Sequence, residues 1–133
     1  MSDTADDELA VRNVVARLAL YADGPDLDAY LDLFTPDASW EMPEGARRGH
    51  AEIRAGSEER RASGQTGPGT NTRHFVTTTA VTVAGDRAVA DSYWQFWVDT
   101  ASAPKIQLIG AYHDELVRLG NDWKLARRQI TIG

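Results

Sequence analysis

The sequence predicts an α+β fold in which helices cover one face of a curved antiparallel sheet. Two observations support this class. Apolar residues in the first half recur at the three- and four-residue spacing of helices, whereas the second half contains runs of Val, Thr and aromatic residues that are typical of strands. The chain has 133 residues, which suit one hydrophobic core, so we expect a single domain across residues 1–133.

The first half contains three predicted helices. The first spans residues 4 to about 22 and should end at the sequence DGP at 23–25, because proline cannot continue a helix and glycine accepts most backbone angles. Its apolar face consists of Val11, Val14, Val15, Leu18 and Tyr21. The other predicted elements are a short helix near 27–34, a turn at 35–37, a short strand at 38–42 and a third helix at 48–63.

Four further strands are predicted after a loop. Residues 64–71, with the sequence GQTGPGTN, have the composition of a loop, and we interpret them as a mobile flap. The predicted strands are 73–83, 87–99, 105–119 and 123–132. The separators AGD, TASAP and GND are typical of hairpin connections, so these strands should form an antiparallel sheet.

The run at 87–99 indicates which face of the sheet meets the helices. Its even positions are mostly apolar and include Trp94 and Phe96, so this face should pack against the helices. Its odd positions are mixed and place Tyr93 and Trp97 on the outer face. Because a monomer would expose both rings, we expect a homodimer or homotrimer.

Composition excludes several classes of partner and site. The chain has 14 basic and 20 acidic residues, a net charge of −6 that repels phosphate and anionic lipid, so we expect neither nucleic acid nor a membrane as a partner. There is no cysteine, and the histidines at 50, 74 and 113 lack ligand spacing, so we expect no metal site. The acidic first ten residues are unlike a signal peptide, and we expect a cytoplasmic protein.

Five polar residues are candidates for chemistry: Asp23, His74, Tyr112, Asp114 and Arg128. Their spacing does not connect them into a motif. A histidine in a strand, an acid at a helix end and an arginine on a strand are each more often structural than catalytic. The residues alone therefore leave a structural and a catalytic interpretation open.

A family resemblance rests on four segments: LFTPDASW, RGHAEIRA, TRHFVT and IGAYHDELVRLGNDWKLARRQI. Over about residues 8–132 the chain resembles the SnoaL-like branch of the nuclear-transport-factor-2-like superfamily. This branch includes polyketide cyclases, scytalone dehydratase, bile acid 7α-dehydratase and lindane dehydrochlorinase. The resemblance implies a cone, in which a bent, mainly antiparallel sheet wraps around three helices and encloses a deep apolar pocket.

The resemblance also implies roles for individual residues. Asp23 and His74 match the catalytic Asp–His pair of the dehydratases, and Arg128 matches an arginine in the site of the dehydrochlorinase. Tyr112 matches a pocket aromatic and is a further catalytic candidate. Leu18 stands where the dehydrochlorinase has its active-site lysine, so dehydrochlorination is not expected. Four aromatic residues are expected to bind substrate: Tyr21, Trp40, Trp94 and Phe96.

The expected function is that of a cofactor-independent dehydratase, isomerase or cyclase acting on a hydrophobic cyclic or polyketide-like small molecule. His74 would relay a proton, and Asp23 would orient it through a contact of about 2.6–3.2 Å. Arg128 or Tyr112 would stabilise developing negative charge. Two alternatives stay open: a non-catalytic protein that binds an apolar small molecule, and an epoxide hydrolase of the same fold that uses Asp114 and Arg128.

Overall fold

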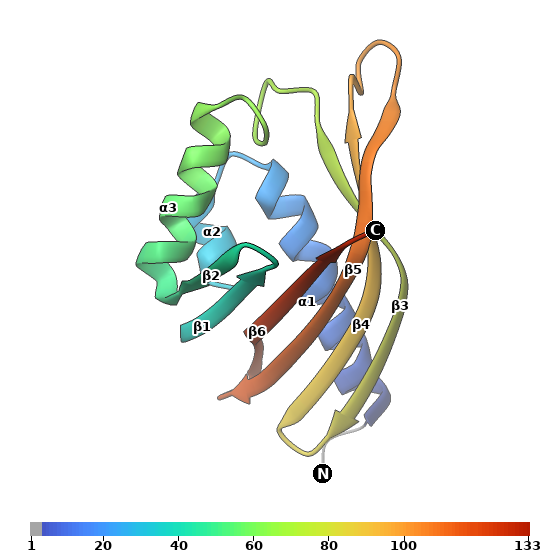
Figure 1. Cartoon of the computed structure of the whole chain (residues 1–133). Coiled ribbons are helices and arrows are strands. Elements are labelled where there is room, and N and C mark those ends of the chain that lie inside the picture. Colours follow the sequence, from blue (N-terminus) through green and yellow to red (C-terminus); the bar gives the residue numbers. More distant parts are fainter. Residues whose placement is uncertain (1–3) are drawn as a thin grey trace.

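The computed structural model describes residues 4–133, and its helices lie on the concave side of one curved sheet (Figure 1). The helices are α1 (Thr4–Asp23), α2 (Leu27–Leu31) and α3 (Gly49–Ala62). The strands are β1 (Phe34–Met42), β2 (Gly45–Arg48), β3 (Arg73–Ala84), β4 (Arg87–Val98), β5 (Lys105–Leu119) and β6 (Asp122–Ile132). The predicted α+β class, with three helices and a curved sheet, is confirmed.

The sheet has the strand order β2-β1-β6-β5-β4-β3. Strands β3 to β6 form the predicted antiparallel hairpins, whereas β1 pairs with β6 in parallel, so the sheet is mixed. The predicted turn at 35–37 is wrong, because β1 already begins at Phe34, where we expected the second helix to end. Strand β2 was not predicted at all. The cause is tertiary: Phe34 pairs with Leu125 of β6, which local sequence does not reveal.

The core lies between the helices and the concave face of the sheet. Helix α1 packs against β3, β4 and β6, and α3 packs against β1 and β2. The even positions of β4 from 88 to 96 are buried, as predicted, while Tyr93 on the other face is 61% exposed. A second apolar cluster on the same face consists of Trp94, Phe96, Tyr112 and Ile130. Trp40 and Val76 pack against both this cluster and the main core.

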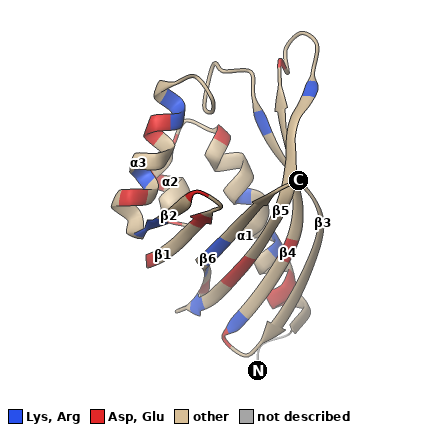
Figure 2. Cartoon of the chain, in the orientation of Figure 1, with Lys and Arg blue, Asp and Glu red and all other residues tan. Residues whose placement is uncertain are grey.

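Charged side chains lie on the helices and on the central strands. Helix α3 carries both signs along its length, and the neighbouring strands β5 and β6 pair acidic with basic residues (Figure 2). Among the described residues, no helix is long and apolar enough to cross a membrane.

Candidate active site

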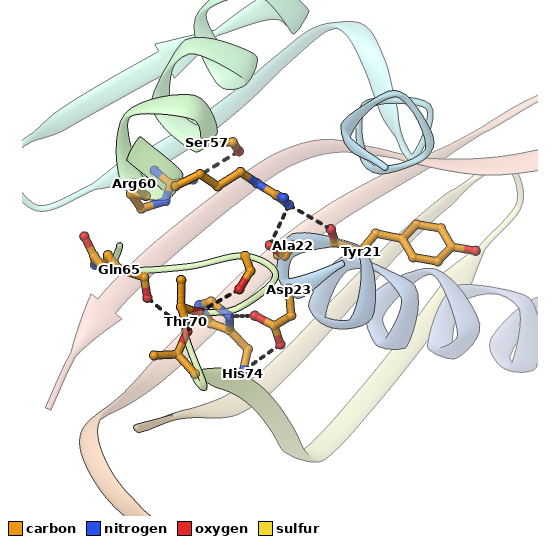
Figure 3. Close-up of polar contacts among 11 residues, drawn as sticks. Tyr21, Ala22, Asp23, Ser57, Arg60, Gln65, Thr70 and His74 are labelled. Carbon is orange, nitrogen blue, oxygen red and sulfur yellow. Dashed lines mark hydrogen bonds and ion pairs between the residues drawn. The ribbon is translucent and has the colours of Figure 1, made fainter. Parts of the chain in front are cut away.

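Asp23 and His74 contact each other, although 51 residues separate them in the sequence. Asp23 is the last residue of α1, and His74 is the second residue of β3. The Asp23 carboxylate accepts the backbone N–H of His74 through Oδ2 at 2.8 Å and lies 2.8 Å from His74 Nδ1 through Oδ1 (Figure 3). The predicted contact is therefore present, and both carboxylate oxygens are used.

The end of α1 is held in place by α3. Arg61 Nη2 donates to the carbonyl oxygens of Tyr21 and Ala22, at 3.4 and 3.0 Å (Figure 3). Carbonyls in the last turn of a helix lack partners within the helix, so these bonds stabilise the helix end that carries Asp23. The sequence DGP ends α1 at Asp23, one residue beyond the predicted boundary.

The carboxylate determines which nitrogen of His74 can act as a base. A carboxylate only accepts hydrogen bonds, so a neutral His74 ring must carry its proton on Nδ1 and leave the lone pair on Nε2. The ring also packs on Phe96, with 4.8 Å between ring centroids. Its side chain is 21% exposed, which restricts access of water without sealing the site. His74 is thus oriented with Nε2 as the available proton acceptor.

His74 lines a small cavity of about 50 Å³. Its polar lining includes Tyr30, Arg60, Thr66, Tyr112 and Arg128. Ligand pockets typically measure about 300–1,000 Å³, so this cavity is small. The prediction of a deep apolar pocket stays a prediction, since the cavity beside His74 is narrow and largely polar.

Arg128 lines this cavity with a guanidinium whose charge is balanced by an ion pair. Its Nε and Nη2 donate to the two oxygens of Asp114 at 2.8 and 2.9 Å, and both residues are buried. The guanidinium also lies 3.7 Å from the ring centroid of Tyr112. Burial would lower the pKa of Arg128, but the charge and hydrogen bonds of Asp114 outweigh it and raise the pKa above its ordinary value. Arg128 therefore stays charged and rigid.

Two tyrosines in the cavity stay protonated. Burial raises the pKa of Tyr112 to about 12, against a lowering effect of Arg128. Burial likewise raises the pKa of Tyr30. Both phenols are therefore available as hydrogen-bond donors at neutral pH.

Arg60, on α3, is a cavity residue that the sequence analysis missed. Its guanidinium lies 4.9 Å from the ring centroid of Trp40, and its Nη2 donates to Ser57 Oγ at 3.3 Å. Within residues 4–133 it forms no ion pair with a carboxylate. Desolvation by burial lowers the pKa of Arg60. No sequence signal separates it from the other arginines of α3.

Comparisons with known proteins identify the family of this chain. The SnoaL-like domain model matches residues 3–129. The chain belongs to the SnoaL-like family. The predicted family is therefore confirmed, and a comparison with curated protein sequences found no match.

Solved structures share the SnoaL-like fold with this chain. A protein of unknown function from Nostoc punctiforme, described as cystatin-like, is 22% identical with a TM-score of 0.88, and the match covers 100% of this chain and 96% of that one. A protein from Novosphingobium aromaticivorans, named as a candidate aromatic ring hydroxylase, is 26% identical with a TM-score of 0.80 and coverage of 98% and 92%. Another from that organism, named as a candidate scytalone dehydratase, is 19% identical with a TM-score of 0.78 and coverage of 100% and 89%.

The structure brings some predicted site residues of this SnoaL-like chain together and leaves others apart. His74, Tyr112, Arg128 and Trp40 line the cavity, and Asp23 contacts His74 from behind. The roles assigned to these residues stay predictions.

The other three aromatic residues do not line the cavity. Trp94 stacks on Tyr112, with 5.8 Å between ring centroids, and Phe96 packs on His74, so both support site residues from outside. The Tyr21 ring points away from Asp23 (Figure 3). Two positions along a helix correspond to a rotation of about 200°, which places these side chains on opposite faces. Tyr21 therefore does not line this cavity, and its expected role in substrate binding stays a prediction.

The described part of the chain contains no group of three or more His, Asp or Glu side chains that could hold a metal ion. The arrangement instead combines an oriented imidazole with phenol and guanidinium donors. Such a set can move a proton and stabilise negative charge on oxygen.

Proposed function

We propose that this protein is a cofactor-independent dehydratase, isomerase or cyclase that acts on a hydrophobic cyclic or polyketide-like small molecule. The observation that carries the proposal is the orientation of His74, whose Nδ1 is held by Asp23 while its ring lines a cavity. Membership in the SnoaL-like family and the 26% identity to a candidate aromatic ring hydroxylase support a small ring compound as the substrate.

The reaction begins with proton transfer to His74. Nε2 takes a proton from a carbon next to a carbonyl group of the substrate, and the electron pair of the C–H bond moves to form an enolate. Asp23 stabilises the imidazolium that results, as the carboxylate does in hydrolase triads. Tyr112, a neutral phenol, and the charged Arg128 stabilise the enolate oxygen.

The second step returns the proton. The imidazolium gives it to a hydroxyl group on the neighbouring carbon, and that C–O bond breaks to release water and form a double bond. Return of the proton to a different carbon gives isomerisation instead. Attack of the enolate carbon on a second carbonyl, which takes up the proton, gives cyclisation. All three outcomes share the first step, so the same residues serve each of them.

The first step, removal of a proton from the carbon next to a carbonyl group, can be tested without knowing the natural substrate. The protein is incubated in D₂O with a panel of cyclic and aromatic ketones, and exchange of the hydrogens next to the carbonyl is followed by proton NMR. We expect the wild-type protein to accelerate exchange for members of the panel, and His74→Gln to lose about 10²-fold or more of that rate.

His113→Gln is the matched control. His113 also pairs with an aspartate, through Nδ1 at 2.6 Å from Asp91 Oδ1, but it lies on β5 and does not line the cavity beside His74. The His113→Gln variant should catalyse hydrogen exchange of the ketones at the wild-type rate. A His74→Gln variant that catalyses this exchange at the wild-type rate would contradict the proposal. Binding of ketones without any exchange would favour the alternative of a non-catalytic binding protein.

The buried pair of Asp114 and Arg128 favours a second candidate, an epoxide hydrolase. In that reaction carboxylates activate water while arginine holds them in place. The candidate is less well supported, because among the described residues Asp114 is the one carboxylate that forms an ion pair with Arg128. Hydrolysis of cyclic epoxides that is lost in Asp114→Asn and kept in His74→Gln would establish it.

A further inference from the structure

The charges that line the cavity beside His74 do not balance. Arg128 is neutralised by Asp114 within a bidentate ion pair. Asp23 lies behind His74 and accepts two of its hydrogen bonds. Arg60 is left as a partly buried cation without a carboxylate partner in the described chain.

The residues around Arg60 do not supply a carboxylate partner among the described residues. Its neighbour Glu59 is the nearest candidate in sequence, but that carboxylate pairs with Arg47 at 2.7 Å. Gly56, one turn earlier on α3, keeps the space beside the guanidinium open: a Cβ atom there would lie 3.3 Å from Arg60 Nη1. The Trp40 ring and Ser57 hydroxyl hold the side chain in this position.

Arg60 also lies at a boundary between two cavities. Together with Trp40 it lines both the 50 Å³ cavity beside His74 and an outer groove of about 400 Å³. The groove is bordered by β1, β2 and α3, and its lining includes Met42, Arg47 and Gly56. A ligand too large for the inner cavity can therefore still contact Arg60 from the groove.

We propose that Arg60 binds an anionic oxygen of the ligand, a carboxylate or an acidic enol or phenol, at this boundary. A partly buried cation without a carboxylate partner is less stable than a paired one, and a ligand anion supplies the missing charge and further hydrogen-bond acceptors. Trp40 lines both spaces as well, so its ring can contact the apolar part of the ligand. If the proposed function holds, its substrates are acidic ring compounds. Binding of an anion at Arg60 does not itself depend on proton transfer by His74.

Two probes of the same shape test the charge preference directly. The probes are 2-naphthoate and the uncharged 2-naphthalenemethanol, titrated into the full chain while the four tryptophan indole N–H signals are followed by NMR. We expect naphthoate to bind about 10- to 100-fold more tightly. The Trp40 signal should shift, and the signal of Trp123, which is buried and does not line either cavity, should not. Equal affinities of the wild-type protein for the two probes would overturn the proposal without any variant.

Variants then assign the preference to one residue. Arg60→Gln should bind both probes equally, and Arg60→Lys should keep part of the preference. Arg54→Gln is the control, because Arg54 lies on the same helix, pairs with Asp28 and lines neither cavity. A preference that survives Arg60→Gln, or one that Arg54→Gln abolishes, would overturn the assignment.

A last variant separates this proposal from the proposed function. His74→Gln should keep the preference for naphthoate, because it removes the base and leaves Arg60 in place. If His74→Gln loses the preference, the anion is bound by His74 and not by Arg60. If the preference is present but no ketone exchanges hydrogen, the anion site stands and the proposed catalysis fails.

Discussion

Replacing Asp23 by asparagine should reverse the tautomer of His74. In the wild-type protein the carboxylate contacts both the backbone N–H and Nδ1 of His74, each at 2.8 Å. An asparagine can accept only through its oxygen. If that oxygen keeps the backbone N–H, the amide N–H₂ faces Nδ1 and donates to it. The ring proton must then move to Nε2, and the lone pair needed for proton transfer is lost.

The size of the effect follows from one hydrogen bond. A hydrogen bond to a charged group contributes about 1.5–3 kcal/mol, and each 1.4 kcal/mol is a factor of ten in population, so the Nδ1–H tautomer of the wild-type protein should exceed the other by about 10- to 100-fold. Asp23→Asn should remove this excess and reverse it. The backbone bond to His74 is kept, so we expect the free energy of unfolding to fall by only about 1 kcal/mol. The rate of hydrogen exchange from ketones should fall by about 10²- to 10⁴-fold.

The assay is long-range ¹H–¹⁵N NMR of the histidine rings, which identifies the nitrogen that carries the proton in each neutral ring. The other two histidines are internal standards. His113 contacts Asp91 through Nδ1 and should show the Nδ1–H form in both proteins. His50 has its Nε2 at 3.1 Å from the carbonyl oxygen of Phe34, and a carbonyl only accepts, so it should show the Nε2–H form. An Nε2–H form of His74 in the wild-type protein, or an unchanged Nδ1–H form in Asp23→Asn, would refute the reasoning.

Three further predictions concern stability. Gly110→Ala should lower the free energy of unfolding, measured by chemical denaturation, by about 1–3 kcal/mol or more, because its Cβ would lie 2.0 Å from the carbonyl oxygen of Thr131 and 2.6 Å from the Trp94 ring; an unchanged midpoint would contradict this. Asp114→Asn should cost about 3–5 kcal/mol by the same assay, because it leaves a buried arginine unpaired, and a loss below 1 kcal/mol would contradict this. Hydrogen bonds from Arg127 lower the pKa of Glu41 from 4.5 to about 2. The contribution of Glu41 to the free energy of unfolding should therefore be complete above about pH 4.5 and decline as the pH falls toward 2. Thermal unfolding of Glu41→Gln, followed against pH, should lack this decline.

The sequence alone was sufficient for the elements whose signals are local. The spacing of Val11, Val14, Val15 and Leu18 predicted α1, and all four are buried. The DGP sequence located the end of that helix within one residue. Alternation along β4 identified the buried face, because successive side chains of a strand point to opposite sides wherever the strand lies. The resemblance to SnoaL-like proteins then supplied the Asp23–His74 pair, which spacing alone did not connect.

Features that depend on segments meeting in space were decided by the tertiary structure. Phe34 enters a strand because β6 lies beside it, and the same residue followed a helical pattern in the sequence. Tyr21 turns away from the cavity because rotation along α1 separates it from Asp23, although the two are close in sequence. Arg60 is one of several arginines on α3 by composition. It becomes a candidate anion-binding residue only because the fold pairs Glu59 with Arg47 and Asp114 with Arg128. Of the two arginines that line the cavity beside His74, Arg60 is thereby left without a carboxylate partner among the described residues.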